Sequence, residues 1–72
     1  MEQKILEILR KTLECPTADE TCSRENCDNW DSLHNLSLAV ELEMEFNVSL
    51  EPDEIEQLCS YNDVVRIVKS KM

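Results

Sequence analysis

The sequence predicts an all-α fold: a four-helix bundle with three long helices, one short helix, and a long loop between the first two. Apolar residues recur at spacings of three and four in separate segments, as they do on amphipathic helices. The chain has no glycine, which disfavours the tight hairpins that connect β-strands. Its 72 residues are enough for one small core, so we expect a single domain over residues 1–72.

The first helix is expected at residues 3 to about 14, where charged residues surround an apolar face made of Ile5, Leu6, Ile8, Leu9 and Leu13. Pro16 is expected to stop this helix. Residues 16–30 show no period and are rich in polar, turn-forming residues, which predicts a long ordered loop. Trp30 closes the loop, and we expect its ring to anchor the loop against the helices.

The second helix is expected at residues 32–46, with Asp31 or Ser32 as its N-cap. At about 100° per residue, its apolar residues form two stripes on nearly opposite sides. We name them the Leu33 stripe, made of Leu33, Leu36, Val40 and Met44, and the Leu38 stripe, made of Leu38, Leu42 and Phe46.

Two interpretations of these stripes are open. A central helix could be buried on both sides, or one stripe could form the core while the other meets a partner or a ligand. Acidic residues lie between the stripes, and burying unpaired carboxylates is costly. The acidic residues therefore favour a helix with one exposed apolar stripe.

The last third of the chain predicts a short helix and a long one. Asn47 is a good helix terminator, and residues 48–50 could form a short extended segment. Pro52 suits the first turn of a short helix from Asp53 to about Leu58. Ser60 with Asp63 three residues later is a capping signal for a final helix to about residue 70.

The charge of the chain restricts its partners. Sixteen acids and seven bases give a formal net charge of −9, so neither nucleic acid nor an anionic membrane is an expected partner. A basic protein surface is the natural complement, although the charge could also serve solubility alone. The chain opens on an amphipathic pattern without a signal-like run, and no segment approaches transmembrane length, so we expect a cytoplasmic location.

The cysteines and the single histidine give little sign of catalysis. In a cytoplasmic protein the four cysteines are expected to be reduced thiols; they are Cys15, Cys22, Cys27 and Cys59. No CxxC pair exists, so we expect no metal site, and a zinc-stabilised regulatory domain is the alternative. His34 lies two residues after Ser32 and faces away from it on a helix, whereas a cysteine approaching His34 stays open. We expect no catalytic residues and no enzymatic activity.

Ser32 lies where the long loop meets the two-faced helix. It could be a plain N-cap, worth about 1 kcal/mol. The position also suits a phosphate, because the free backbone N–H groups and the positive end of the helix dipole favour an anion.

The segment Asp31-Ser32-Leu33 resembles the attachment motif of the acyl carrier protein family. The resemblance continues through the helix-two pattern that ends in Glu-x-x-Phe at Phe46, and through the starts of the last two helices at Glu51–Glu54 and Tyr61–Val65. It covers roughly residues 28–69. The version found here, with Trp30 before the triplet, resembles specialised or stand-alone carrier proteins encoded beside biosynthetic enzymes.

The resemblance implies a bundle of acyl-carrier-protein type and a covalent cofactor. A phosphopantetheinyl transferase would join 4′-phosphopantetheine from coenzyme A to Ser32, and Asp31 would help to position magnesium during that transfer. The arm would carry acyl groups as thioesters in fatty acid, polyketide or related specialised biosynthesis.

The family also implies a partner face for synthase and acyl-transferring enzymes with basic docking surfaces. This face would comprise Leu33, Leu36, Val40, Glu41 and Met44, while the Leu38 stripe would face the core. We expect a monomer. The alternative is a helical protein-interaction module that carries no prosthetic group.

Overall fold

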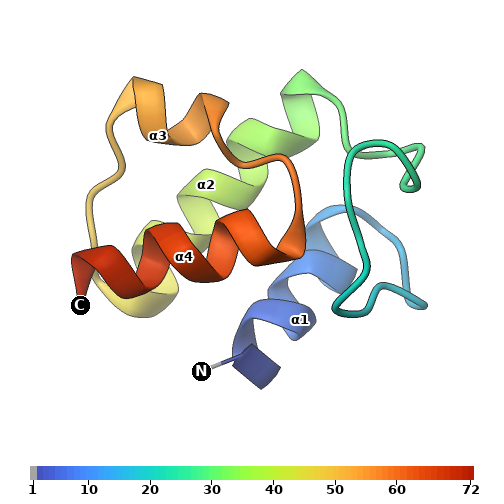
Figure 1. The fold of residues 1–72 in the computed structure, drawn as a ribbon, viewed down its shortest axis with the longest axis horizontal. Helices are drawn as coiled ribbons and strands as arrows, with labels where there is room; N and C mark the ends of the chain where they lie inside the picture. Colours follow the sequence, from blue (N-terminus) through green and yellow to red (C-terminus); the bar gives the residue numbers. More distant parts are fainter. Residues whose placement is uncertain (1) are drawn as a thin grey trace.

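The computed structural model describes residues 2–72. Its elements follow the order α1 (Glu2–Thr12), α2 (Ser32–Phe46), α3 (Pro52–Glu56) and α4 (Tyr61–Lys71), as Figure 1 shows. Three helices are long and α3 is short, and no β-strand occurs in this part of the chain, where Ser23 and Ser60 form an isolated bridge. The predicted all-α bundle is confirmed.

The ends of α1 and α2 are set by residues in the left-handed conformation. Glu14 has a φ of 53°, and the N–H of Cys15 donates to the carbonyl of Arg10 over 3.1 Å. This is a Schellman closure, so the prediction that Pro16 stops the helix was wrong: α1 has already ended at Thr12. Asn47, with a φ of 55°, ends α2 as predicted.

The last two helices differ slightly from the prediction. The side chain of Ser60 accepts from the N–H of Asp63 over 3.2 Å, which confirms the predicted cap of α4. Helix α3 begins at Pro52 and ends at Glu56, two residues before the predicted end. Residues 48–50 form no strand.

The core lies between α1, α2 and α4, and all three helices contribute side chains to it. The largest fully buried side chains are Ile5, Leu9, Leu13, Leu38, Leu42, Leu58, Val64 and Val68. Of the Leu38 stripe, Leu38 and Leu42 are fully buried, and Phe46 packs half-buried against the core. This stripe therefore forms the inner face of α2.

The α1–α2 loop (residues 13–31) is hydrogen-bonded to the α3–α4 connection and to the first residue of α4. The N–H of Arg24 donates to the carbonyl of Cys59, and the N–H of Tyr61 donates to the carbonyl of Cys22, both over 2.9 Å. Trp30 is buried, which confirms its predicted role as the anchor of the loop. These contacts hold the loop beside the α3–α4 connection (Figure 1).

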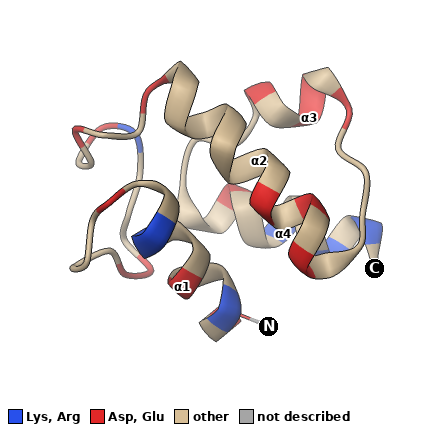
Figure 2. Cartoon of the chain, turned by 180° about the vertical axis from the view of Figure 1, so that it is seen from behind, with Lys and Arg blue, Asp and Glu red and all other residues tan. Residues whose placement is uncertain are grey.

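Charge is distributed unevenly over the fold. Figure 2 shows lysines and arginines on α1, on α4 and at one place in the loop but none on α2 or α3, while acids occur on all four helices and in the loop. Arg24 is the only lysine or arginine between Lys11 and Arg66 in the sequence. Within residues 2–72, no helix has both the length and the apolar character that crossing a membrane requires.

Candidate functional site

Ser32 occupies the first position of α2, and its side chain is exposed. The N-cap is Asp31, whose Oδ1 accepts from the N–H of His34 over 2.9 Å. Of the two predicted caps, Asp31 is thus the one that is used. The Ser32 side chain is therefore accessible from outside the molecule, where it lines an open pocket.

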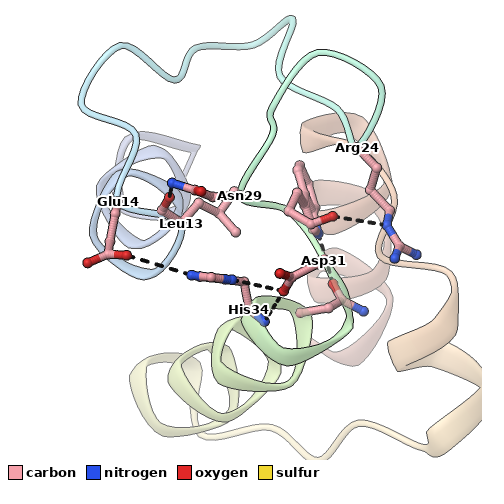
Figure 3. Close-up of polar contacts among 8 residues, drawn as sticks. Leu13, Glu14, Arg24, Asn29, Asp31 and His34 are labelled. Carbon is pink, nitrogen blue, oxygen red and sulfur yellow. Dashed lines mark hydrogen bonds and ion pairs between the residues drawn. The ribbon is translucent and has the colours of Figure 1, made fainter.

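His34 links the start of α2 to the end of α1, as Figure 3 shows. Its Nδ1 lies 2.9 Å from Oδ1 of Asp31, and its Nε2 lies 3.7 Å from Oε2 of Glu14. The hydrogen bond with Asp31 raises the pKa of His34, and the backbone and ring of His34 together lower the pKa of Asp31. Both ring nitrogens therefore face carboxylates rather than Ser32 or a cysteine.

Asn35 is a buried polar residue that the sequence analysis did not identify. Its Oδ1 accepts from Nε1 of Trp30 over 2.9 Å, and its Nδ2 donates to the carbonyl of Ile55 over 2.8 Å. A buried amide whose oxygen and nitrogen are both hydrogen-bonded holds the groups that it joins in fixed positions. Asn35 thus holds the end of the loop and the end of α3 against the first turn of α2.

An open pocket of about 280 Å³ lies beside Ser32. Its lining comes from the loop, α2 and α3, and consists of Arg24, Ser32, Asn35, Leu36, Ile55 and Glu56. It offers one cation, one carboxylate, an amide and two apolar side chains next to the hydroxyl. A small amphipathic group attached to Ser32 can therefore rest against the protein.

The Leu33 stripe is exposed along the outer side of α2. The exposed fraction is 76% for Leu33, 54% for Leu36, 53% for Val40 and 73% for Met44. A second pocket, of about 310 Å³, lies on this stripe and is lined by Leu36, Ser37, Val40 and Glu41. The prediction of one core stripe and one exposed stripe is confirmed.

The acids of α2 have different surroundings. Glu41 lies 3.6 Å from Nζ of Lys11, and Glu45 lies 3.9 Å from Nζ of Lys4. Such exposed pairs contribute little stability. Oε2 of Glu43 instead accepts from the N–H of Leu50, which ties the α2–α3 connection to the helix. Glu41 remains at the edge of the Leu33 stripe.

The cysteines lie away from Ser32. Cys15, Cys22 and Cys27 line a third pocket, of about 190 Å³, within the α1–α2 loop, and Cys59 is exposed elsewhere. All four are free thiols, and burial raises the pKa of Cys22 to about 12, so it stays protonated and unreactive. In the described part of the chain, no group of three or more histidine, cysteine or acidic side chains is arranged to hold a metal ion.

Comparisons with known proteins find similarity among solved structures. No family model matches the sequence, and no curated protein matches it. Among solved structures, the crystal structure of an acyl carrier protein from Thermotoga maritima matches with a TM-score of 0.76 and 27% sequence identity. The match covers 96% of this chain and 82% of that one. This match supports a relationship to the acyl carrier protein family, and the fold is that of a carrier protein rather than that of an enzyme.

Proposed function

We propose that this chain is an acyl carrier protein, with residues 1–72 forming a single carrier domain in the cytoplasm. It carries acyl intermediates as thioesters on a 4′-phosphopantetheine arm attached to Ser32. The observation that carries the proposal is the exposed hydroxyl of Ser32 at the start of α2, with the exposed Leu33 stripe beginning at the next residue. The similarity to the Thermotoga maritima acyl carrier protein supports it.

The surroundings of Ser32 fit this prosthetic group. A phosphodiester at the first position of a helix is favoured by the helix dipole and the free backbone N–H groups. The pocket beside Ser32 offers Leu36 and Ile55 to apolar atoms and the exposed Arg24 to polar ones. When attached, the group supplies a terminal thiol that holds an acyl unit as a thioester.

Attachment uses the Ser32 hydroxyl as the acceptor in a phosphopantetheinyl transferase. Oγ of Ser32 forms a bond to the phosphorus that carries the pantetheine, and the P–O bond within the pyrophosphate of coenzyme A breaks. Adenosine 3′,5′-bisphosphate leaves, and the hydroxyl proton goes to the transferase or to solvent. Asp31 would position the magnesium ion: its two intramolecular contacts use Oδ1, and more than half of its side chain is exposed.

Partner enzymes would meet the protein on the Leu33 stripe. Its four apolar side chains supply contact area, and Glu41 at the edge offers a carboxylate to a basic surface. The net charge of −9 attracts such a surface from a distance. The partners proposed are the transferase and acyl-transferring or synthase enzymes of fatty acid, polyketide or related specialised biosynthesis, and the carrier acts as a monomer.

The decisive experiment is loading with coenzyme A and a broad-specificity phosphopantetheinyl transferase, followed by intact-mass measurement. The wild type should gain the mass of one phosphopantetheine group. Ser32→Ala should gain nothing, whereas Ser49→Ala, which removes an exposed serine between α2 and α3 and away from the Leu33 stripe, should load like the wild type. A wild type that stays unmodified with several transferases contradicts the proposal.

An unmodified protein-interaction module is the second candidate, because the exposed Leu33 stripe could serve docking alone. The two functions differ in what Ser32→Ala changes. A carrier loses acyl transfer while keeping its fold, but a pure module binds its partner as before. Val40→Glu should weaken partner binding in both cases, so it tests the Leu33 stripe as the docking surface, and Ser32→Ala alone separates the two functions.

A further inference from the structure

Arg24 lies beside the proposed attachment point, Ser32. It is the only lysine or arginine between Lys11 and Arg66, and it lines the same pocket as Ser32. Nothing in the sequence motif involves it, since it lies within the aperiodic loop. Its position next to Ser32 comes entirely from the way in which the loop is folded.

The backbone around Arg24 is fixed from two sides. Its N–H donates to the carbonyl of Cys59 over 2.9 Å, and Ser23 forms the bridge with Ser60. Its Nε donates to the carbonyl of Trp30 over 3.4 Å, which draws the side chain toward the residues just before Ser32. In Figure 3, Arg24 and His34 lie on opposite sides of Asp31. The guanidinium is therefore held beside the start of α2.

The charge of Arg24 is not neutralised by the chain. In the described residues, five of the seven lysines and arginines lie within ion-pair distance of a carboxylate: Lys4, Lys11, Arg66, Lys69 and Lys71. Arg24 does not, although Glu56 lines the same pocket. A phosphodiester on Ser32 would bring a negative charge into a chain of net charge −9. Arg24 is the one lysine or arginine that lines the pocket next to this negative charge.

We propose that the Arg24 guanidinium pairs with the phosphodiester on Ser32 and so turns the start of the arm into the pocket lined by Leu36 and Ile55. Arg24 is thus a positioning residue for the prosthetic group. The planar guanidinium matches phosphate oxygens with two parallel hydrogen bonds, which a lysine does not reproduce. The pair is solvent-exposed, so salt weakens it. This inference rests on the proposed attachment at Ser32.

The test compares loaded wild type with loaded Arg24→Gln, Arg24→Lys and Arg66→Gln. Arg66→Gln is the matched control, because it removes an exposed arginine on α4 that already pairs with Asp63. Circular dichroism first verifies that the unloaded variants are folded. Phosphorus NMR then reports the environment of the phosphodiester, and proton–nitrogen NMR reports the Nε–H of Arg24 before and after loading.

We expect the Arg24 Nε–H signal of the wild type to shift on loading and the phosphorus resonance to move in Arg24→Gln but not in Arg66→Gln. Added salt should bring the wild-type phosphorus signal toward that of Arg24→Gln, and Arg24→Lys should give an intermediate position. Equal phosphorus signals in wild type and Arg24→Gln, with an unmoved Arg24 signal, overturn the inference while attachment stands. Absence of any mass gain on loading overturns the attachment itself.

Discussion

At the scale of single residues, His34 is the group whose charge changes near neutral pH. Its ring contacts Asp31 at the start of α2 and Glu14 at the end of α1. Both partners are carboxylates, so the protonated ring makes the stronger contacts, and the pKa of His34 is raised. A histidine with a raised folded-state pKa adds stability below its unfolded-state pKa, and this stability is lost as the pH rises through the folded-state pKa.

Replacing His34 by alanine should therefore lower stability more in acid than in base. We expect the difference in melting temperature between wild type and His34→Ala to be larger near pH 5.5 than near pH 8.5, on either side of an ordinary histidine pKa of about 6.5. Thermal unfolding followed by circular dichroism measures it. Glu14→Gln, which removes one of the two partners, should reduce the pH dependence partly. An equal difference at both pH values would contradict this role of His34.

The residues of the site differ in how well the sequence predicted them. Ser32 and the Leu33 stripe follow from a helix start and a helical period, which are local signals. Glu14 reaches the site from the end of α1, and Arg24 reaches it from the aperiodic loop, whose path is set by backbone bonds to distant residues. Asn35 looked like any polar residue of a helix, because its partner Ile55 lies twenty residues away. A contact between two segments that lie far apart in the sequence cannot be predicted from the residue pattern of either segment alone.

At the scale of elements, the ends of the helices are where prediction and structure differ. Helix α4 was placed well, because a serine cap and a strong period occur together. Helix α3 has five residues, too few for a period to define its end, and Leu58 beyond it is buried by tertiary packing. The end of α1 was assigned to Pro16 because glutamate, unlike asparagine or glycine, gives no sign of a left-handed conformation.

Asn47 allows this type of helix end to be tested without disturbing other contacts. It is exposed, has a φ of 55°, and its backbone N–H donates to the carbonyl of Glu43. Glycine adopts this conformation at no steric cost, whereas a Cβ costs roughly 1–2 kcal/mol for most residues. Asn47→Ala should therefore lower the free energy of unfolding by about 1 kcal/mol, and Asn47→Gly should not lower it. Urea unfolding measures both; equal destabilisation by the two would be inconsistent with this geometry.

At the scale of the whole molecule, self-repulsion opposes folding. The chain has a formal net charge of −9 within principal extents of 27 × 23 × 17 Å. At about 0.01 M salt the screening length is about 30 Å, so almost every charge interacts with every other; at about 1 M it is about 3 Å. Three of the ion pairs between helices are exposed and weak, and only the pair of Lys71 with Glu54 is partly buried, so we expect repulsion to be the larger effect.

The melting temperature should therefore rise when sodium chloride is increased over that range. The double variant Glu20→Gln/Glu25→Gln removes two exposed loop acids and should melt higher than the wild type at low salt, with a smaller response to added salt. Differential scanning calorimetry measures the melting temperatures of the wild type and of the double variant at low and at high salt. A melting temperature that falls with salt would mean that ion pairs outweigh repulsion.

The use of Asp31 rather than Ser32 as the helix cap has a consequence for how the molecule is handled in the cell. The residue that caps the first turn is Asp31 and not Ser32, the residue for which we propose modification, so derivatising Ser32 would sacrifice no capping bond. Under the proposed function, the bare and the derivatised polypeptide would therefore share one architecture. An enzyme that acts before the modification and one that acts after it would bind the same shape, and the group at Ser32 alone would distinguish the two forms.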